Sequence, residues 1–247
     1  MTLNAVKEMP TLLGSSQLTL GVTLKPQQQL GNFCFSGAPA LAKTVELLLA
    51  NVQADSIYVF GAEGVGKSHF LQGCVLQAQE IGCEAVYISC KELVNIPSYQ
   101  ADECLAGLDN NDLLCVDDID CLVADNHWAQ AWFHLYNKFM QRGNRLVISA
   151  TSNPRTIDCK LNDLRSRLQL ANVFQLSALD EAASGRLLQA KAKQKGLQLS
   201  DDQVAYIFSR SPRGLNNVLA VLDLLDAASW NEKRRITIPF IKQVMAW

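Results

Sequence analysis

The chain has 247 residues, of which 49% are hydrophobic and 19% are charged, a balance typical of a soluble globular protein with a substantial core. No apolar run approaches the roughly 20 residues that a membrane-spanning helix needs. The formal net charge of −2 argues against non-specific binding to a polyanion such as DNA.

The first ten residues lack the basic cluster and apolar stretch of a secretory signal, so we expect a cytoplasmic protein without a membrane association. Eight cysteines are scattered along the chain and form no C-x-x-C pair, which argues against a zinc site. Several lie in apolar runs, where a cysteine behaves as a small buried hydrophobic residue. Free thiols of this kind suit a reducing cytoplasm.

Residues 1–30 are interpreted as a mobile tail. Pro10, Pro26 and a run of three glutamines leave it without any sustained periodicity. One short apolar segment, Gln17–Val22, interrupts this tail.

Residues 31–178 are predicted to form an α/β domain. A helix is expected at Ala40–Asn51, where apolar residues fall at helical spacing. After it, short apolar strands alternate with helices, which indicates right-handed crossovers and a parallel sheet covered by helices on both faces. The strands are predicted at Ser56–Phe60, Ala85–Ser89, Leu113–Val116, Leu146–Ser149 and Val173–Leu176, and further helices at Lys67–Ile81 and His127–Gln141.

Residues 179–247 show only helical patterns and are predicted to form a small all-helical unit. Ser200 and Gln203 fit a capping box, in which each side chain bonds the other residue's backbone at the start of a helix. The basic run Lys233–Arg235 is expected in a loop between helices. The helices are predicted at Asp180–Lys195, Ser200–Ser209, Leu215–Ala228 and Phe240–Met245.

The segment Gly61–Ser68 matches the G-x-x-x-x-G-K-[ST] pattern of a phosphate-binding loop, and it lies between a predicted strand and a predicted helix. Glycines let the backbone wrap closely enough for its N–H groups to point at phosphate oxygens, and a helix N-terminus favours an anion. Lys67 supplies a cation to the phosphates, and Ser68 supplies a hydroxyl to Mg²⁺. We therefore predict that ADP or ATP binds here with Mg²⁺.

The contacts to this nucleotide are assigned to the loop and the residue after it. His69 is counted with them, although packing within the helix is the simpler interpretation. The assigned residues are Gly61, Glu63, Gly64, Val65, Gly66, Lys67, Ser68 and His69.

A second motif is the apolar strand that ends in Asp117 and Asp118. The carboxyl ends of parallel strands lie at the sheet edge where nucleotides bind in such folds. We assign Asp117 to the Mg²⁺ shell, together with Ser68, and Asp118 to polarising the attacking water. Capping of the following helix is the alternative for Asp118.

In these motifs and their order the chain resembles the AAA+ ATPases, and within them the DnaA branch of replication initiators, over roughly Phe33–Trp247. The resemblance implies a polar sensor after the fourth strand, which is Asn153 or Thr151. It implies an arginine finger in the segment Leu164–Leu168, where the serine–arginine pair makes Arg167 the finger. It also implies a second sensor at the start of a lid helix, which is Arg213.

Such a finger is expected to face a neighbouring subunit and to stabilise charge on the phosphoryl group there, so the protein would act on ATP bound to a partner. The resemblance also implies a dimer or larger homo-oligomer. Initiators of this branch carry a DNA-reading helix-turn-helix unit, and no basic recognition helix follows the helical unit here, so we expect no sequence-specific DNA binding.

The tail segment Gln17–Val22 resembles the short peptide with which bacterial proteins dock on the DNA polymerase sliding clamp. In this interpretation Gln17 bonds at the rim of a pocket, and Leu18, Leu20 and Val22 supply apolar contacts. A strand packing on its own domain is the alternative. The resemblance as a whole implies a regulator that docks on the clamp and promotes hydrolysis of ATP bound to DnaA, with weak turnover of its own.

Two other classes remain as alternatives. A helicase loader of the DnaC type would hydrolyse its own ATP and bind single-stranded DNA, for which a basic groove is expected. A P-loop kinase would transfer phosphate to a small molecule, but several arginines in a substrate lid are expected there and the chain shows none.

Overall fold

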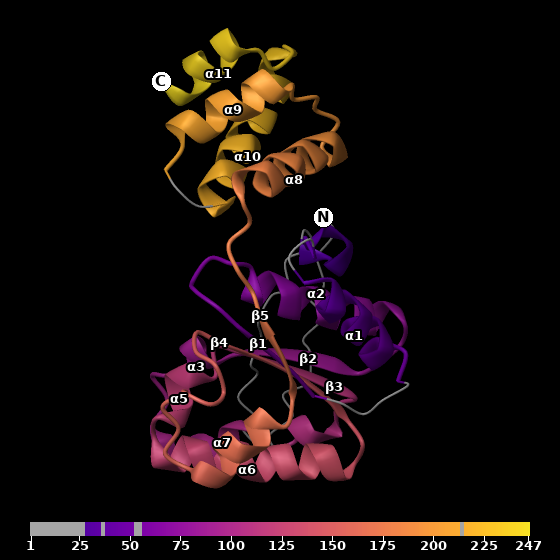
Figure 1. Cartoon of the computed structure of the whole chain (residues 1–247), viewed down its shortest axis with the longest axis vertical. Coiled ribbons are helices and arrows are strands. Elements are labelled where there is room, and N and C mark those ends of the chain that lie inside the picture. Colours follow the sequence, from indigo (N-terminus) through magenta and orange to yellow (C-terminus); the bar gives the residue numbers. More distant parts are fainter. Residues whose placement is uncertain (1–27, 36–37, 52–55, 213–214) are drawn as a thin grey trace, which may run out of the picture.

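The computed structural model describes residues 28–35, 38–51, 56–212 and 215–247. It confirms an α/β fold with a five-stranded parallel sheet and a C-terminal group of helices (Figure 1). The sheet has the order β2-β3-β4-β1-β5, so β1 lies between β4 and β5 and every pairing is parallel. The strands are β1 (Ser56–Phe60), β2 (Ala85–Ser89), β3 (Leu113–Asp117), β4 (Arg145–Ala150) and β5 (Asn172–Gln175).

Helices cover both faces of the sheet, as its continuous apolar strands predict. Figure 1 shows α1 (Pro39–Leu49) and α2 (Lys67–Glu80) on one face and α6 (Asn126–Gln141) and α7 (Asn162–Gln169) on the other. Because successive side chains of a strand point to opposite faces, Ile57 packs in the core beneath α2, and Tyr58 packs in the core beneath α6.

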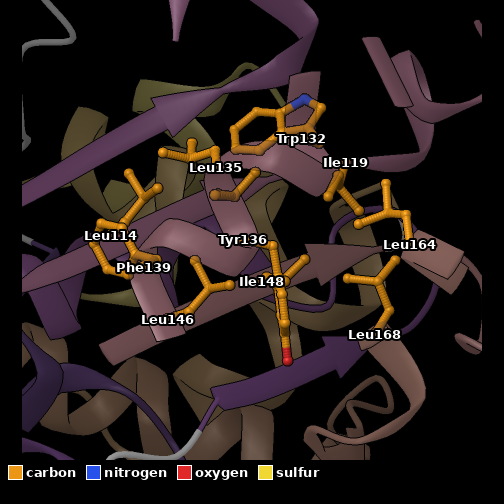
Figure 2. A pocket seen from close by; sticks show the side chains of 11 residues that line it. Leu114, Ile119, Trp132, Leu135, Tyr136, Phe139, Leu146, Ile148, Leu164 and Leu168 are labelled. Atoms are coloured by element: carbon orange, nitrogen blue, oxygen red, sulfur yellow. The ribbon is translucent and has the colours of Figure 1, made fainter. Parts of the chain in front are cut away.

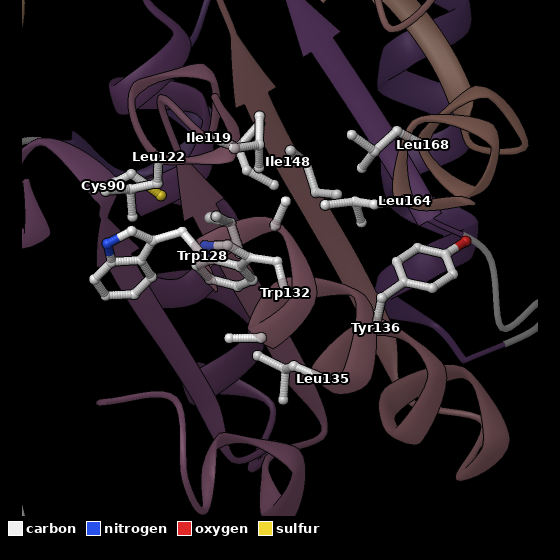
Figure 3. Close-up of a cluster of buried hydrophobic side chains, with 14 of the residues drawn as sticks. Cys90, Ile119, Leu122, Trp128, Trp132, Leu135, Tyr136, Ile148, Leu164 and Leu168 are labelled. Carbon is white, nitrogen blue, oxygen red and sulfur yellow. The ribbon is translucent and has the colours of Figure 1, made fainter. Parts of the chain in front are cut away.

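The core beneath α6 is the larger of the two and contains two tryptophans (Figure 3). Trp128 and Trp132 are 3% and 4% exposed, so both pack one face of their helix into this core. The helix begins at an N-cap, Asp125, whose side chain accepts hydrogen bonds from the backbone of His127 and Trp128.

The connections after β2 and β3 contain three one-turn helices. These are α3 (Cys90–Leu93) and α4 (Ala101–Cys104) between β2 and β3, and α5 (Asp120–Val123) after β3. The sequence pattern does not predict them, because four residues are too few to show a helical period. Contacts between α3 and α5 bring the segment after β2 against the segment after β3.

The C-terminal unit consists of α8 (Glu181–Gln194), α9 (Asp201–Arg210), α10 (Leu215–Glu232) and α11 (Ile238–Met245), packed around a core of their own (Figure 1). The capping box is confirmed, with the hydrogen bonds of Ser200 and Gln203 both present. The basic run Lys233–Arg235 lies between α10 and α11, as predicted.

The segment before α1 lies against α2. Leu30–Asn32 form a short 3-10 helix, and a Cβ atom placed on Gly73 of α2 would come within 2.9 Å of the Leu30 nitrogen. Only a glycine leaves room for this approach of two backbones. None of the helices in the described residues combines the length and the hydrophobicity that a membrane-spanning helix requires.

Candidate nucleotide-binding site

The loop Gly61–Ser68 connects β1 to α2 and turns at its glycines. Gly64 and Gly66 have φ values of 81° and 100°, in the region that favours glycine. A Cβ atom on Gly61 would lie 2.2 Å from the carbonyl oxygen of Leu176, which directly follows β5. Thus the loop geometry requires glycine at these positions, and it leaves the N-terminus of α2 free to face a bound anion.

Lys67 is the first residue of α2 and is buried. Its Nζ donates hydrogen bonds to the carbonyl oxygens of Gly61 (2.8 Å) and Ala62 (3.1 Å). The ammonium group therefore lies over the loop. A loop of glycine backbone with a cation over it is a donor set that fits a polyphosphate.

A cleft of about 1190 Å³ opens beside this loop. It is lined by loop residues 62–66, by His69, by the chain between β5 and α8, and by parts of α8, α9 and α10. The volume is ample for a nucleotide, since pockets for small ligands typically hold roughly 300–1,000 Å³.

His69 lines the cleft, and its ring packs against the segment that precedes α1. Its Nε2 lies 3.4 Å from the carbonyl oxygen of Gln29, and its ring meets that of Phe33 edge to face at 5.8 Å between centroids. Burial lowers the pKa of His69 below its ordinary value, so the ring is neutral at pH 7.

Asp117 ends β3 and is 2% exposed. Both of its carboxylate oxygens accept hydrogen bonds from hydroxyl groups on neighbouring strands: Oδ2 from Tyr87 at 2.6 Å, and Oδ1 from Ser149. Burial, and then the bond to Asp117, raise the pKa of the Tyr87 hydroxyl, so it stays a donor. Tyr87 therefore fixes the carboxylate of Asp117, one of the two residues assigned to Mg²⁺.

Asp118 follows with a φ of 54°, a left-handed conformation that aspartate tolerates better than most residues. Its backbone N–H donates to Ser149 Oγ at 2.9 Å, so one serine of β4 fixes both acids. Its Oδ2 lies 2.9 Å from Nζ of Lys91, on α3. The same ammonium is 3.7 Å from Glu63 of the loop.

Oxygen ligands and a buried carboxylate suit Mg²⁺. Ser68 and Asp117 are the residues that would hold its shell, and a bound Mg²⁺ would neutralise charge on the phosphates.

Tyr87, Lys91 and Ser149 were outside the sequence assignment. Ser149 lies one residue beyond the paired Val116 and Ile148, so register alone places it beside Asp117. The strand–strand register was the signal that could have found it. Nothing local marks Tyr87 or Lys91, because their positions depend on the β2–β3 pairing and on α3 packing against α5.

The two candidates for the first sensor make local contacts. Thr151 donates from its backbone N–H (3.0 Å) and from its hydroxyl to Asp120 Oδ2. The side chain of Asn153 accepts a hydrogen bond from the backbone of Arg155 at 2.9 Å and so caps a turn. Both lie just beyond β4.

Arg167 lies on α7 and is exposed. Figure 1 places α7 beside α6, on the face of the sheet opposite α2, so Arg167 is not brought together with the P-loop helix of its own chain. Within the described parts of the chain, its guanidinium makes no ion pair. Its neighbour Arg165, in contrast, donates to Asn162 Oδ1 at 2.5 Å.

Two assignments lie outside the described residues: the second sensor, Arg213, and the tail segment Gln17–Val22. Ser211 and Pro212, directly before Arg213, line the cleft.

A second cavity lies in the core beneath α6 (Figure 2). It measures about 10 Å³. Aliphatic side chains and Phe139 line it together with Trp132 and Tyr136. A buried water needs at least that volume and two to four polar partners. This cavity is a packing defect and not a ligand site.

Comparison with known proteins agrees with this geometry. Residues 24–175 match the family of bacterial DnaA ATPase domains, and residues 177–245 match the lid domain of Hda. Domain III of the Thermotoga maritima replication initiation protein DnaA is 18% identical, with a TM-score of 0.74 over 91% of this chain and 98% of that one.

Two further structures share the fold. DnaA from Aquifex aeolicus with bound AMPPCP is 20% identical, with a TM-score of 0.71 over 85% of this chain and 68% of that one. The RuvB Holliday junction branch migration motor of Thermotoga maritima is 17% identical, with a TM-score of 0.64 over 86% of this chain and 70% of that one.

Proposed function

Because this chain belongs to the family of bacterial DnaA ATPase domains and carries an Hda-type lid, we propose that it regulates the initiation of DNA replication by acting on DnaA. It binds ADP or ATP with Mg²⁺ at Gly61–Ser68 and docks on the sliding clamp through Gln17–Val22. It then promotes hydrolysis of ATP bound to DnaA. The observation that carries this proposal is the match to a DnaA-type ATPase and an Hda lid in one chain.

Arg167 is the residue that acts on the partner. Arg167 is exposed on α7 and has no ionic partner among the described residues, and α7 itself lies on the sheet face opposite α2 (Figure 1). These properties suit a cation that completes another subunit's site. There it would stabilise charge on the phosphoryl oxygens during hydrolysis.

The test of this role is Arg167→Ala, measured as the rate of hydrolysis of DnaA-bound ATP in the presence of clamp loaded on DNA. Because arginine fingers supply roughly 10³–10⁵ in rate, we expect most of the stimulation to disappear while this chain's own nucleotide affinity is unchanged. Arg165→Ala, two residues away on the same helix, is the matched control. Weakened nucleotide binding by the Arg167 variant, with stimulation retained per bound nucleotide, would contradict a role in trans.

Clamp docking is tested separately with the double variant Gln17→Ala, Leu20→Ala. We expect it to lose capture by immobilised clamp and to keep nucleotide binding, because the P-loop is a different part of the chain. Thr19→Ala, between two of the proposed anchors, should still bind. Equal capture of the double variant and the control would remove the clamp from the proposal.

A related structure is a DnaA bound to AMPPCP and single-stranded DNA. For this chain we propose the nucleotide and not the DNA, because its net charge is −2 and no sustained basic run occurs in the sequence apart from Lys233–Arg235. Fluorescence anisotropy with a labelled oligo(dT) checks this. Tight, salt-sensitive binding would favour the helicase-loader alternative.

A further inference from the structure

Helix α10 exposes an apolar stripe on the side that faces away from the core of the C-terminal unit. Its buried residues in that core are Val218, Val221, Leu222 and Leu225. Exposed apolar residues recur along the opposite side at steps of four, three and three, the spacing of neighbours on one helix face. They are Ala220, Leu224, Ala227 and Trp230. Leu224 is 55% exposed and Trp230 is 84% exposed, and a contiguous apolar surface of this kind marks an interaction site.

A hollow of about 320 Å³ runs along the stripe. The residues that line it all belong to α10: Asp223, Asp226, Ala227, Trp230 and Asn231. Both aspartates pair with a single cation, Lys195 of α8, at 3.1 Å each. Two carboxylates share one ammonium, so this part of the stripe keeps an excess of negative charge.

The other end of the stripe is basic. The run Lys233–Arg235 follows directly after α10. Within the part of the chain that the structure describes, only Arg234 of this run makes an ion pair, with Glu232 at 3.1 Å. The helix face is therefore apolar in the middle, acidic toward its N-terminal side and basic at its C-terminal end. An antiparallel copy of the same helix would match it in both respects.

We propose that this face joins two copies of the chain through an antiparallel contact between their α10 helices. With a twofold axis at Ala227, Trp230 of each copy lies opposite Leu224 of the other, because both are three residues from the axis. The small side chain at Ala227 lets the helices approach closely where they cross. Lys233 lies opposite residue 221 and so about 3 Å along the helix axis from Asp223 of the other copy. A twofold contact makes each of these interactions twice.

This contact differs from the one that Arg167 requires. A finger that acts on another subunit's nucleotide needs a head-to-tail contact through α7, whereas the contact proposed here uses the same face of both copies. Figure 1 places α10 and α7 at opposite ends of the molecule. The paired molecule would therefore present two copies of Arg167, both outside the contact. The inference depends neither on the bound nucleotide nor on the action on DnaA.

The size of the face indicates a weak, reversible dimer. An aromatic side chain buries about 150–250 Å², so the two Trp230 rings contribute about 300–500 Å². Stable interfaces bury about 1,200–2,000 Å² in total, and Leu224 with the flanking charges adds only part of the difference. The population of dimer should therefore depend on protein concentration and fall as salt screens the charges.

The first test is sedimentation velocity of the full chain over a series of concentrations. Tryptophans at the centre of an interface carry much of its binding energy, so we expect Trp230→Gln to raise the dissociation constant of the dimer by about tenfold or more. Tyr99→Gln is the matched control, since Tyr99 is also an exposed aromatic residue (75%) but lies in the sheet domain. An unchanged dissociation constant in Trp230→Gln would overturn the proposal.

The second test checks the register of the two helices. Ala227→Cys is treated with a mild oxidant, and disulfides are mapped by peptide mass spectrometry so that those of the native cysteines are identified separately. We expect a disulfide between the two copies of residue 227. In Ala220→Cys the two new thiols would be separated by about 21 Å along the axis, far beyond disulfide reach. Equally efficient cross-linking at 220 and 227 would contradict the antiparallel contact.

A chain that stays monomeric at every concentration would also overturn the proposal. If Trp230→Gln then reduced the stimulation of DnaA, the face would belong to a contact with that partner instead. Both tests are carried out without nucleotide, clamp or DnaA, so failure of the proposed function would leave their results unaffected.

Discussion

The P-loop and the acidic edge of the sheet are neighbours, yet they are held together by different parts of the chain. The loop is one continuous stretch whose shape comes from glycine backbone and from Lys67 bonding to carbonyls of the same loop. The acidic edge, Asp117 and Asp118, is fixed by side chains from β2, α3 and β4. Added side-chain volume should therefore destabilise the first region, whereas the loss of single polar groups should destabilise the second.

The largest effect is expected at Gly61. A methyl group there would overlap the Leu176 carbonyl at 2.2 Å, and both atoms are tied to backbone that cannot easily shift. We expect Gly61→Ala to lower the free energy of unfolding by about 3 kcal/mol, at the upper end for overpacking. Chemical denaturation followed by tryptophan fluorescence measures it.

The matched variant is Gly64→Ala, where nothing lies within 4 Å of an added Cβ and only the φ of 81° opposes it. Strain of this kind costs about 1–2 kcal/mol. Equal losses in the two variants would mean that close approach to Leu176 does not set the identity of residue 61.

A smaller effect is expected at the acidic edge from Ser149→Ala. This change leaves Asp117 Oδ1 without its donor and the Asp118 N–H without its acceptor, both in buried surroundings. A buried group left unpaired costs about 1–3 kcal/mol, so we expect a loss near 2 kcal/mol together with weaker Mg²⁺-dependent nucleotide binding. The measurements are chemical denaturation and titration calorimetry.

Ser166→Ala serves as the comparison, because that hydroxyl is exposed and bonds only a carbonyl in its own helix. Its loss should be within about 0.5 kcal/mol. If Ser149→Ala were equally mild, the acids would be fixed mainly by Tyr87 and Lys91.

The smallest expected effect is on the pH dependence of stability, and it comes from His69, which directly follows the P-loop. Burial lowers the pKa of His69, so the unfolded chain binds a proton more readily than the folded one. Stability from this residue is therefore present above the unfolded value of about 6.5 and declines as the pH falls below it. His69→Gln should flatten the pH dependence of unfolding in that range, and an unchanged slope would assign the pH dependence to other groups.

The sequence predicts the sheet well because buried parallel strands are apolar throughout. All five strands lie within one residue of their expected ends, and the strand–loop–helix context of Gly61–Ser68 follows from local pattern. The helix α7 was not among the predicted elements. Its mixed polar surface gives little apolar period over eight residues, although its motif singled out Arg167.

The acidic site was predicted only in its central residues. Asp117 and Asp118 can be found because they end an apolar strand, but Tyr87, Lys91 and Ser149 reach them from segments about 30 residues away in the chain. Such partners depend on strand register and on the packing of a one-turn helix. Neither leaves a pattern in a single sequence.

Because Leu30 lies against Gly73 of α2, the segment that connects the proposed clamp-docking residues to the ATPase domain is short. Only residues 23–27 separate the proposed clamp-docking segment from the chain that lies on α2. Five residues, fully extended, span about 20 Å between their flanking Cα atoms. If Gln17–Val22 docks on the sliding clamp as proposed, the ATPase domain would therefore lie close to the clamp. The connecting segment would lead to α2, the helix that begins with Lys67.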